Sequence, residues 1–121
     1  MYRMLMLLTI AICFLVFILN FSKVMPEFPS AEFNFRFYCA QCHGLDAKGG
    51  GVNAIRHLPV APRDLTDSKA MGKLSDDEIL EVIRNGGIAP ARSTLMPPFK
   101  NTIQEIEILY LKEYIRELCD C

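Results

Sequence analysis

Two cysteines and a histidine stand together in the run Cys39-Ala40-Gln41-Cys42-His43. On a helix, Cys39 and Cys42 are neighbours on one turn, so both thiols can reach one edge of a haem and form thioethers with its two vinyl-derived carbons. His43 can then turn its imidazole under the macrocycle and bind the iron. The pattern C-x-x-C-H is a signature of c-type haem attachment, and it predicts one covalently bound haem c.

Three other chemistries use cysteines at this spacing. Zinc needs four ligands, to which His57 or the two C-terminal cysteines would have to contribute, and the adjacency of Cys42 and His43 is awkward for one tetrahedral ion. A thioredoxin-like redox pair expects a βαβ context, which the sequence does not have. A plain disulfide between Cys39 and Cys42 is the third alternative.

If the attached haem serves to carry electrons, its iron needs a second ligand on the other face of the ring. We expect Met96, which precedes two prolines in a stretch that they keep extended and rigid. His57 and Lys100 are alternative ligands, whereas Met71 is interpreted as a packing residue. Filling both faces leaves no open position for a substrate, which favours a carrier over a haem-based gas sensor or peroxidase.

The segments that must position these groups predict an all-α domain with long connecting loops around the haem. Apolar residues at four-residue spacing predict one short helix from Ala31 into Cys39. Glycines and prolines make residues 44–67 and 87–101 irregular. Loops of this length are usually functional or wrapped around something. No alternating run suited to a strand is present.

Capping patterns mark two longer helices. The first opens with a capping box formed by Ser75 and Glu78 and stops at Gly86. The second is expected to begin at Thr102 with another capping box, and to end near Leu118. The predicted haem wall, which is also core, comprises Phe37, Tyr38, Ile55, Leu65, Ile79, Val82, Ile83, Leu95 and Phe99.

The first 22 residues form a separate apolar segment, in which residues 4–22 carry no charge. Eighteen helical residues span about 27 Å, close to the roughly 30 Å hydrocarbon core of a bilayer. We predict a transmembrane anchor over residues 1–22 and a linker over 23–30; a cleaved export signal is the alternative, although no Ala-x-Ala site follows directly. Arg3 favours an N-terminus in the cytoplasm, with the C-terminal domain on the periplasmic or outer side of the cytoplasmic membrane.

Composition limits the remaining choices. The chain has 121 residues, of which 51% are hydrophobic, and a net charge of −1, so it has no basic footprint for nucleic acid. The residues beyond the apolar segment suffice for one small domain. The tail, residues 119–121, reads Cys-Asp-Cys, a spacing too tight for an easy disulfide. We expect a frayed terminus there, and the alternatives are an unpaired pair of thiols, a metal hook or a link to another chain. Cys13 is interpreted as a small lipid-facing side chain.

Residues 31–118 resemble the class I single-haem cytochromes c, in particular the bacterial branch that occurs free, membrane-anchored or as domains of respiratory complexes. The motifs that carry the resemblance are CAQCH, GLDAKGGG, PRDLTD, the helix LSDDEILEVIRNGG, and MPPF. The resemblance implies that the first and last helices cross. At the crossing, Ala31 and Phe35 of the first helix would meet Leu111 and Tyr114 of the last.

The same resemblance implies a one-electron carrier with His43 and Met96 as axial ligands. It would pass electrons between a quinol-linked donor and a terminal reductase or oxidase, and it would not itself be an enzyme. The alternative is a small haem-bearing subunit of a larger respiratory oxidase or reductase. A backbone carbonyl, which we expect from Pro59, would orient His43, and Arg63 is predicted to pair with a haem propionate.

Overall fold

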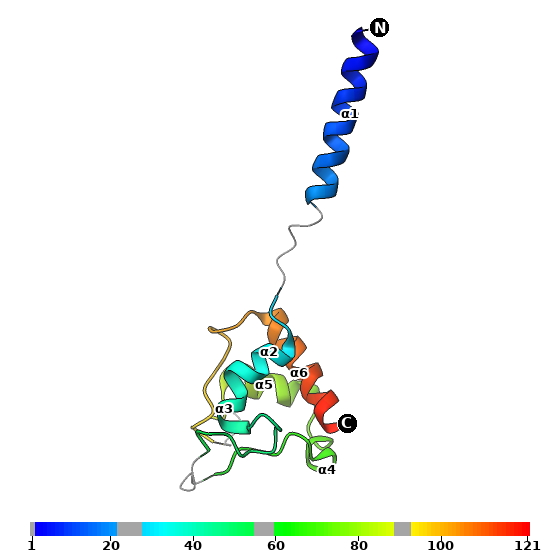
Figure 1. Ribbon diagram of the computed structural model, residues 1–121. Coiled ribbons are helices and arrows are strands. Elements are labelled where there is room, and N and C mark those ends of the chain that lie inside the picture. Colours follow the sequence, from blue (N-terminus) through cyan, green and yellow to red (C-terminus); the bar gives the residue numbers. More distant parts are fainter. Residues whose placement is uncertain (1, 22–27, 55–59, 89–92) are drawn as a thin grey trace.

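The computed structural model describes residues 2–21, 28–54, 60–88 and 93–121. Within these ranges every regular element is helical and no strand occurs, so the predicted all-α class is confirmed (Figure 1). In chain order the elements are α1 (Tyr2–Phe21), α2 (Ala31–Asn34), the π-helical turn η1 (Phe35–Cys39), α3 (Ala40–His43), α4 (Ser68–Met71), α5 (Asp76–Asn85) and α6 (Glu105–Cys119).

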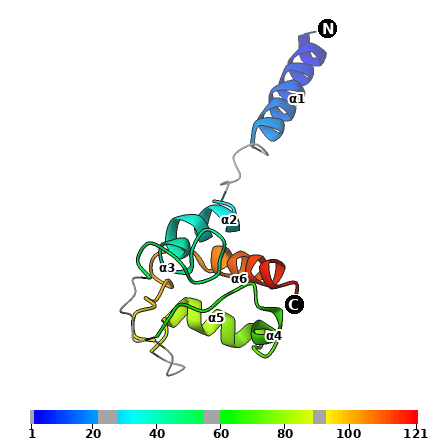
Figure 2. The ribbon, with the colours of Figure 1, turned by 60° about the horizontal axis from the view of Figure 1, so that its bottom comes forward.

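Helix α1 coincides with the predicted apolar segment and stands apart from the other helices in Figures 1 and 2. Its side chains from residue 2 to residue 19 are all exposed. The window Tyr2–Leu19 is long and apolar enough to cross a membrane, judged by length and composition. An apolar helix exposed on every side lacks the single buried stripe that is typical of a helix packed on a soluble core.

Helices α2, η1 and α3 follow one another without a break and carry the Cys-x-x-Cys-His motif. The hydroxyl of Ser30 caps the start by accepting from the Phe33 amide at 3.1 Å. The Ala40 amide donates to the Phe35 carbonyl, five residues back, which makes the middle turn π-helical. The predicted helix into Cys39 is therefore confirmed, and it extends further, to His43.

Helix α2 lies across α6, as the resemblance implies. The rings of Phe35 and Tyr114 pack with centroids 5.5 Å apart, and Phe35 and Leu111 are each only 1% exposed. Beside them the buried Asn34 donates its side-chain amide to the Glu107 carboxylate at 2.9 Å. This apolar crossing with one satisfied polar pair fixes how the motif helix sits on the last helix.

Helix α5 has the predicted ends. The Glu78 amide donates to the Ser75 hydroxyl at 3.2 Å, and the Glu78 carboxylate accepts from the Ser75 amide at 2.8 Å. Gly86 ends the helix at φ +74°, a region that favours glycine. An ion pair between Arg84 and Glu105 connects α5 to the start of α6.

Helix α6 begins later than predicted, so the expected start at Thr102 is wrong. The cap residue is Gln104, whose amide donates to the Glu107 carboxylate at 2.8 Å. The Phe99 carbonyl accepts from the amides of Thr102 and Ile103, which holds this stretch in a turn before the helix. Burial of Phe99 and Ile103 favours that turn over an earlier helix start.

The C-terminal tail also differs from expectation. Cys119 is only 2% exposed and forms a disulfide with Cys121, their Cα atoms lying 5.2 Å apart. The intervening Asp120 has φ +49° and ψ +51°, a left-handed conformation that turns the chain back on itself. This local reversal makes the pairing possible, and the prediction of a frayed tail with unpaired thiols is wrong.

Candidate haem-binding site

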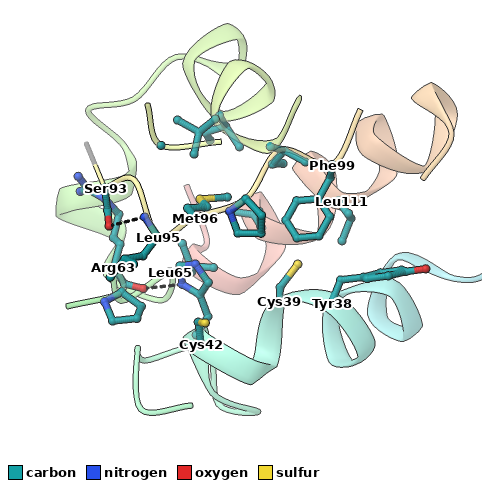
Figure 3. Close-up of a pocket in the computed structure, with 18 of the residues that line it drawn as sticks. Tyr38, Cys39, Cys42, Arg63, Leu65, Ser93, Leu95, Met96, Phe99 and Leu111 are labelled. Carbon is teal, nitrogen blue, oxygen red and sulfur yellow. Dashed lines mark hydrogen bonds between the residues drawn. The ribbon is translucent and has the colours of Figure 1, made fainter. Parts of the chain in front are cut away.

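The Cys-x-x-Cys-His motif lines a cavity of about 520 Å³ between the motif helix, α5, α6 and the loops that follow them (Figure 3). Cofactor pockets are usually about 300–1,000 Å³ in volume. Cys39 on η1 and Cys42 on α3 both contribute to its lining, as does His43. Both cysteines are free thiols, so the alternative of a disulfide between them is wrong.

The loop after the motif folds back under α3 and pairs with its carbonyls. The Gly51 amide donates to the Cys42 carbonyl at 3.0 Å, and the Gly49 amide donates to the His43 carbonyl at 2.6 Å. A Cβ atom on Gly51 would lie 2.4 Å from the Gln41 carbonyl oxygen, so the close approach requires glycine. These bonds satisfy the carbonyls at the end of the short helix and fix the motif backbone.

The imidazole of His43 is oriented by the main chain. Its Nδ1 lies 3.0 Å from the Arg63 carbonyl oxygen, which can only accept, so Nδ1 carries the proton and Nε2 keeps a free lone pair. Burial lowers the pKa of His43, and the bond to Arg63 opposes that shift. Burial thus favours the neutral ring, the form that binds a metal.

The carbonyl that orients His43 belongs to Arg63 and not to Pro59, which lies outside the described residues. The segment around Arg63 is held next to the motif loop by the Leu65 amide, which donates to the Ala47 carbonyl at 2.8 Å. This register presents the Arg63 carbonyl to the ring. The predicted proline-rich region is therefore the right one, but the residue within it is different.

The thiol of Cys39 is held in its neutral form. Burial raises its pKa to about 12, and the nearby Cys42 raises it further. Reactive cysteines have the opposite property, a lowered pKa that maintains a thiolate. Cys39 therefore does not supply the activated thiolate that a thioredoxin-like redox pair requires.

Met96 approaches the cavity from the other side. In Figure 3 its side chain lies across the cavity from the helix that carries Cys39 and Cys42. The Met96 carbonyl accepts from the Gly87 amide at 3.1 Å, and the Phe99 amide donates to the Ile83 carbonyl at 3.0 Å. The end of α5 thus supports the loop that presents this methionine.

These donors fit a haem. Two thiols, a neutral imidazole and a thioether face one cavity whose other walls are largely aliphatic and aromatic. Thioether links, a proximal histidine and a distal methionine form the known ligand set of cytochromes c.

Residues 26–115 match the family model described as cytochrome c oxidase, cbb3-type, subunit III. The chain belongs to this cytochrome c family. Among solved structures it is similar to the KustC0563 c-type cytochrome, with a TM-score of 0.58 and 26% sequence identity over 74% of this chain and 98% of that one. No curated protein matches it. The family makes this chain an electron-transfer protein with covalently bound haem c.

Most of the predicted wall residues line the cavity of the cytochrome. They are Tyr38, Leu65, Ile79, Val82, Ile83, Leu95 and Phe99. Phe37 does not: it is 61% exposed and stacks on Phe33, with ring centroids 6.1 Å apart. Ile55 lies outside the described residues. Sequence reasoning missed Leu111 and Ile115 as lining residues, although their four-residue spacing already put them on one helix stripe.

The alternative iron ligands of this cytochrome have other surroundings. Met71 is 2% exposed, as expected for a packing residue, and forms part of the cavity lining. Lys100 donates to the side-chain carbonyl of Asn85 at 2.9 Å. His57 lies outside the described residues. Within the described ranges no group of three or more His, Cys, Asp or Glu side chains could hold a metal ion, so the zinc alternative has no ligand set there.

Arg63 contributes to the cavity lining as well as to the orientation of His43. Its side chain is visible at the edge of the cavity in Figure 3. Its pairing with a haem propionate stays a prediction.

Proposed function

We propose that this protein is a membrane-tethered cytochrome that carries one electron at a time between respiratory donors and acceptors. In this proposal Cys39 and Cys42 attach a single haem, and His43 and Met96 are the axial ligands. The observation that carries it is the convergence of these four groups on one largely apolar cavity. Arg63 is proposed to pair with a haem propionate.

The chain's own residues suit electron transfer better than catalysis. A bound haem supplies an iron that cycles between its ferric and ferrous states. The hydrogen bond to Arg63 keeps the His43 ring in one orientation and one tautomer. Thioether ligation by Met96 would stabilise the ferrous state and raise the reduction potential relative to two histidines. Two occupied faces leave no position for a substrate, and apolar walls exclude water.

The proposed organisation is an anchor over residues 1–22, a linker over 23–30, a cytochrome domain over 31–118 and a tail over 119–121. The exposed apolar length of α1 supports the anchor, and Arg3 supports an outward-facing domain. Intact mass would report cleavage of the first segment. Protease digestion of sealed, right-side-out vesicles should remove the cytochrome domain, and full protection would contradict this orientation.

A second candidate function is a fixed haem-bearing subunit of a respiratory oxidase complex, and the description of the matching family favours it. The two candidates differ in their association with other chains. Native electrophoresis of gently solubilised membranes, stained for haem, would show co-migration with a large complex if the subunit proposal holds. A haem band at the mass of the single chain would favour the tethered shuttle.

Absorption spectra of the oxidised and reduced chain, produced with a cytochrome maturation system, test the ligand assignment. The haem should remain with the denatured chain, and the double change Cys39→Ala and Cys42→Ala should abolish this attachment. Met96→Ala should keep the haem but remove the near-red sulfur-to-iron band and lower the reduction potential. Lys100→Ala is the matched control and should retain the band. A colourless chain, or an unchanged Met96→Ala spectrum, would overturn the assignment.

A further inference from the structure

The proposed electron carrier makes no use of the cysteine pair at the C-terminus. Cys119 is buried at the end of α6, whereas Cys121 is exposed, and a disulfide joins them. In the chain-entropy model the stabilisation given by a disulfide grows with the length of the loop it closes. A three-residue loop is among the shortest that a disulfide can close. The Cys119–Cys121 disulfide therefore does not stabilise the fold by joining distant segments.

Each sulfur of the pair has a polar neighbour that suits the reduced state. The Cys119 sulfur lies 3.4 Å from the Arg116 carbonyl oxygen, an acceptor for the S–H group that reduction would create. The Cys121 sulfur lies 3.4 Å from Nη1 of Arg116, whose positive charge favours a thiolate. The end of α6 can therefore accommodate both the disulfide and the dithiol.

The same arginine connects the tail to the turn over residues 71–74, which we call the floor of the cavity. Its Nη1 donates to the Met71 carbonyl at 3.2 Å and its Nη2 to the Leu74 carbonyl at 2.6 Å, while Nε donates to Asp76 at 2.9 Å. The side chains of Met71 and Leu74 line the cavity. A contiguous set of contacts thus runs from Cys121 through Arg116 to the turn over residues 71–74.

We propose that Cys119 and Cys121 form a thiol–disulfide exchange site for an extracytoplasmic dithiol, and that its opening loosens the turn at residues 71–74. A thiolate of the reductant attacks the exposed Cys121 sulfur, and the Cys119–Cys121 bond breaks. Cys119 leaves with the electron pair and takes up a proton. The second thiol of the reductant attacks its own sulfur in the mixed disulfide and releases Cys121. Two electrons and two protons pass to the tail, and the reductant departs as a disulfide.

Burial decides which sulfur of the disulfide is attacked, because Cys119 is buried and Cys121 is exposed. In the haem-loaded full chain carrying Cys13→Ala, the variant Cys119→Ala leaves Cys121 as the only tail cysteine, and Cys121→Ala leaves Cys119. Glutathione disulfide should modify the isolated Cys121 about tenfold faster, on exposure grounds, than the isolated Cys119. Equal rates, or faster modification of Cys119, would overturn the proposed point of attack.

Equilibration of the same Cys13→Ala protein with mixtures of reduced and oxidised dithiothreitol, followed by alkylation and peptide mass mapping, tests reversibility. Cys119 and Cys121 should become alkylated together and close again on reoxidation. A pair that stays oxidised in excess dithiol, or that never closes, would contradict the proposal. Alkylation at Cys39 or Cys42 would instead contradict the proposed haem attachment, so the two failures are distinguishable.

Hydrogen exchange tests the connection to the cavity floor. The Leu74 amide donates to the Met71 carbonyl inside this turn, and the amides of Met71 and Gly72 donate to the carbonyls of Asp67 and Ser68 just before it. All three amides should exchange faster in the reduced protein than in the disulfide form. In Arg116→Lys, which keeps the charge but loses the guanidinium fork, this difference should shrink. The exposed neighbour Glu117→Gln is the control and should preserve it. Identical exchange in both redox states of the unmodified tail would refute the connection.

Discussion

Two sides of the cavity are built by different means. The motif wall, residues 39–51, is a short helix followed directly by a loop, and the loop amides of Gly49 and Gly51 satisfy the helix carbonyls of His43 and Cys42. The methionine wall, residues 93–99, makes its supporting bonds to a separate element, at Ile83 in α5 and at Gly87 just after that helix. The first wall is therefore specified by a short continuous sequence. The second depends on a helix that must already be in place, and this contrast predicts different responses to mutation.

The largest effect should come from removing the support beneath the motif wall. Phe35→Ala empties a site that is 1% exposed in the crossing of α2 and α6, and we expect a loss of about 3–5 kcal/mol in the free energy of unfolding. Phe33→Ala, two residues earlier and 55% exposed, should change it by about 0.5 kcal/mol or less. Denaturant titrations of both variants measure the difference. Equal losses would mean that the crossing does not support the motif.

A smaller loss should follow from crowding the motif wall itself. A methyl group on Gly51 would lie 2.4 Å from the Gln41 carbonyl oxygen and 2.6 Å from that of Ala40. Gly51→Ala should cost about 1–3 kcal/mol of stability and lower the yield of covalently attached haem. Gly50→Ala is the matched control, because its Cβ would meet no atom within 4 Å. A normal haem yield in Gly51→Ala would show that the wall can shift.

The methionine wall should respond differently to the same kind of change. Gly86 has φ +74°, and a Cβ there would lie 2.5 Å from the Met96 carbonyl oxygen. With ψ −174° this backbone conformation is essentially confined to glycine, so Gly86→Ala should cost about 1–3 kcal/mol for the conformation alone. We expect the haem to stay attached while the near-red band weakens, because Met96 is displaced and the motif is not. Loss of attachment together with the band would abolish the contrast between the walls.

The smallest effect should come from outside both walls, at the ion pairs that Asp76 at the start of α5 makes with Lys112 and Arg116 of α6. Hydrogen bonds from Lys112 and Arg116 lower the pKa of Asp76 below its usual 3.8. Its contribution to stability is therefore present above pH 3.8 and is lost as the pH falls from there through the lowered folded-state value. Asp76→Asn should be slightly less stable than the parent protein at pH 7, with a gap that closes in acid. Asp77→Asn, on the same turn, is the control, and acid titrations of unfolding measure both.

Local signals predicted local structure well. The capping box of Ser75 and Glu78 needs only four residues, and it is present as expected. The box expected at Thr102 is absent, because Phe99 and Ile103 are buried in a turn that sequence spacing does not reveal. The four-residue helix α4 was missed, although Asp67 before it caps the Ala70 amide at 2.9 Å and was its signal.

The candidate site follows the same rule. The motif cysteines and His43 were identifiable because one short stretch contains them. The carbonyl partner of His43 was misplaced because it lies twenty residues away, and its register depends on the contact between Ala47 and Leu65. The disulfide at the tail was missed because it requires a left-handed Asp120, a conformation that spacing alone does not predict.

The π-helical turn over Phe35–Cys39 gives one stretch of the chain an unusually strict length. In a regular α-helix each residue rotates the next side chain by about 100°, so deleting one residue from this wide turn would swing Cys39 around the helix axis by about that angle. The Phe35 end would still pack on α6, but the first cysteine would face away from the cavity. Related chains that keep the motif should therefore tolerate substitutions between the Ser30 cap and Cys39 more readily than insertions or deletions.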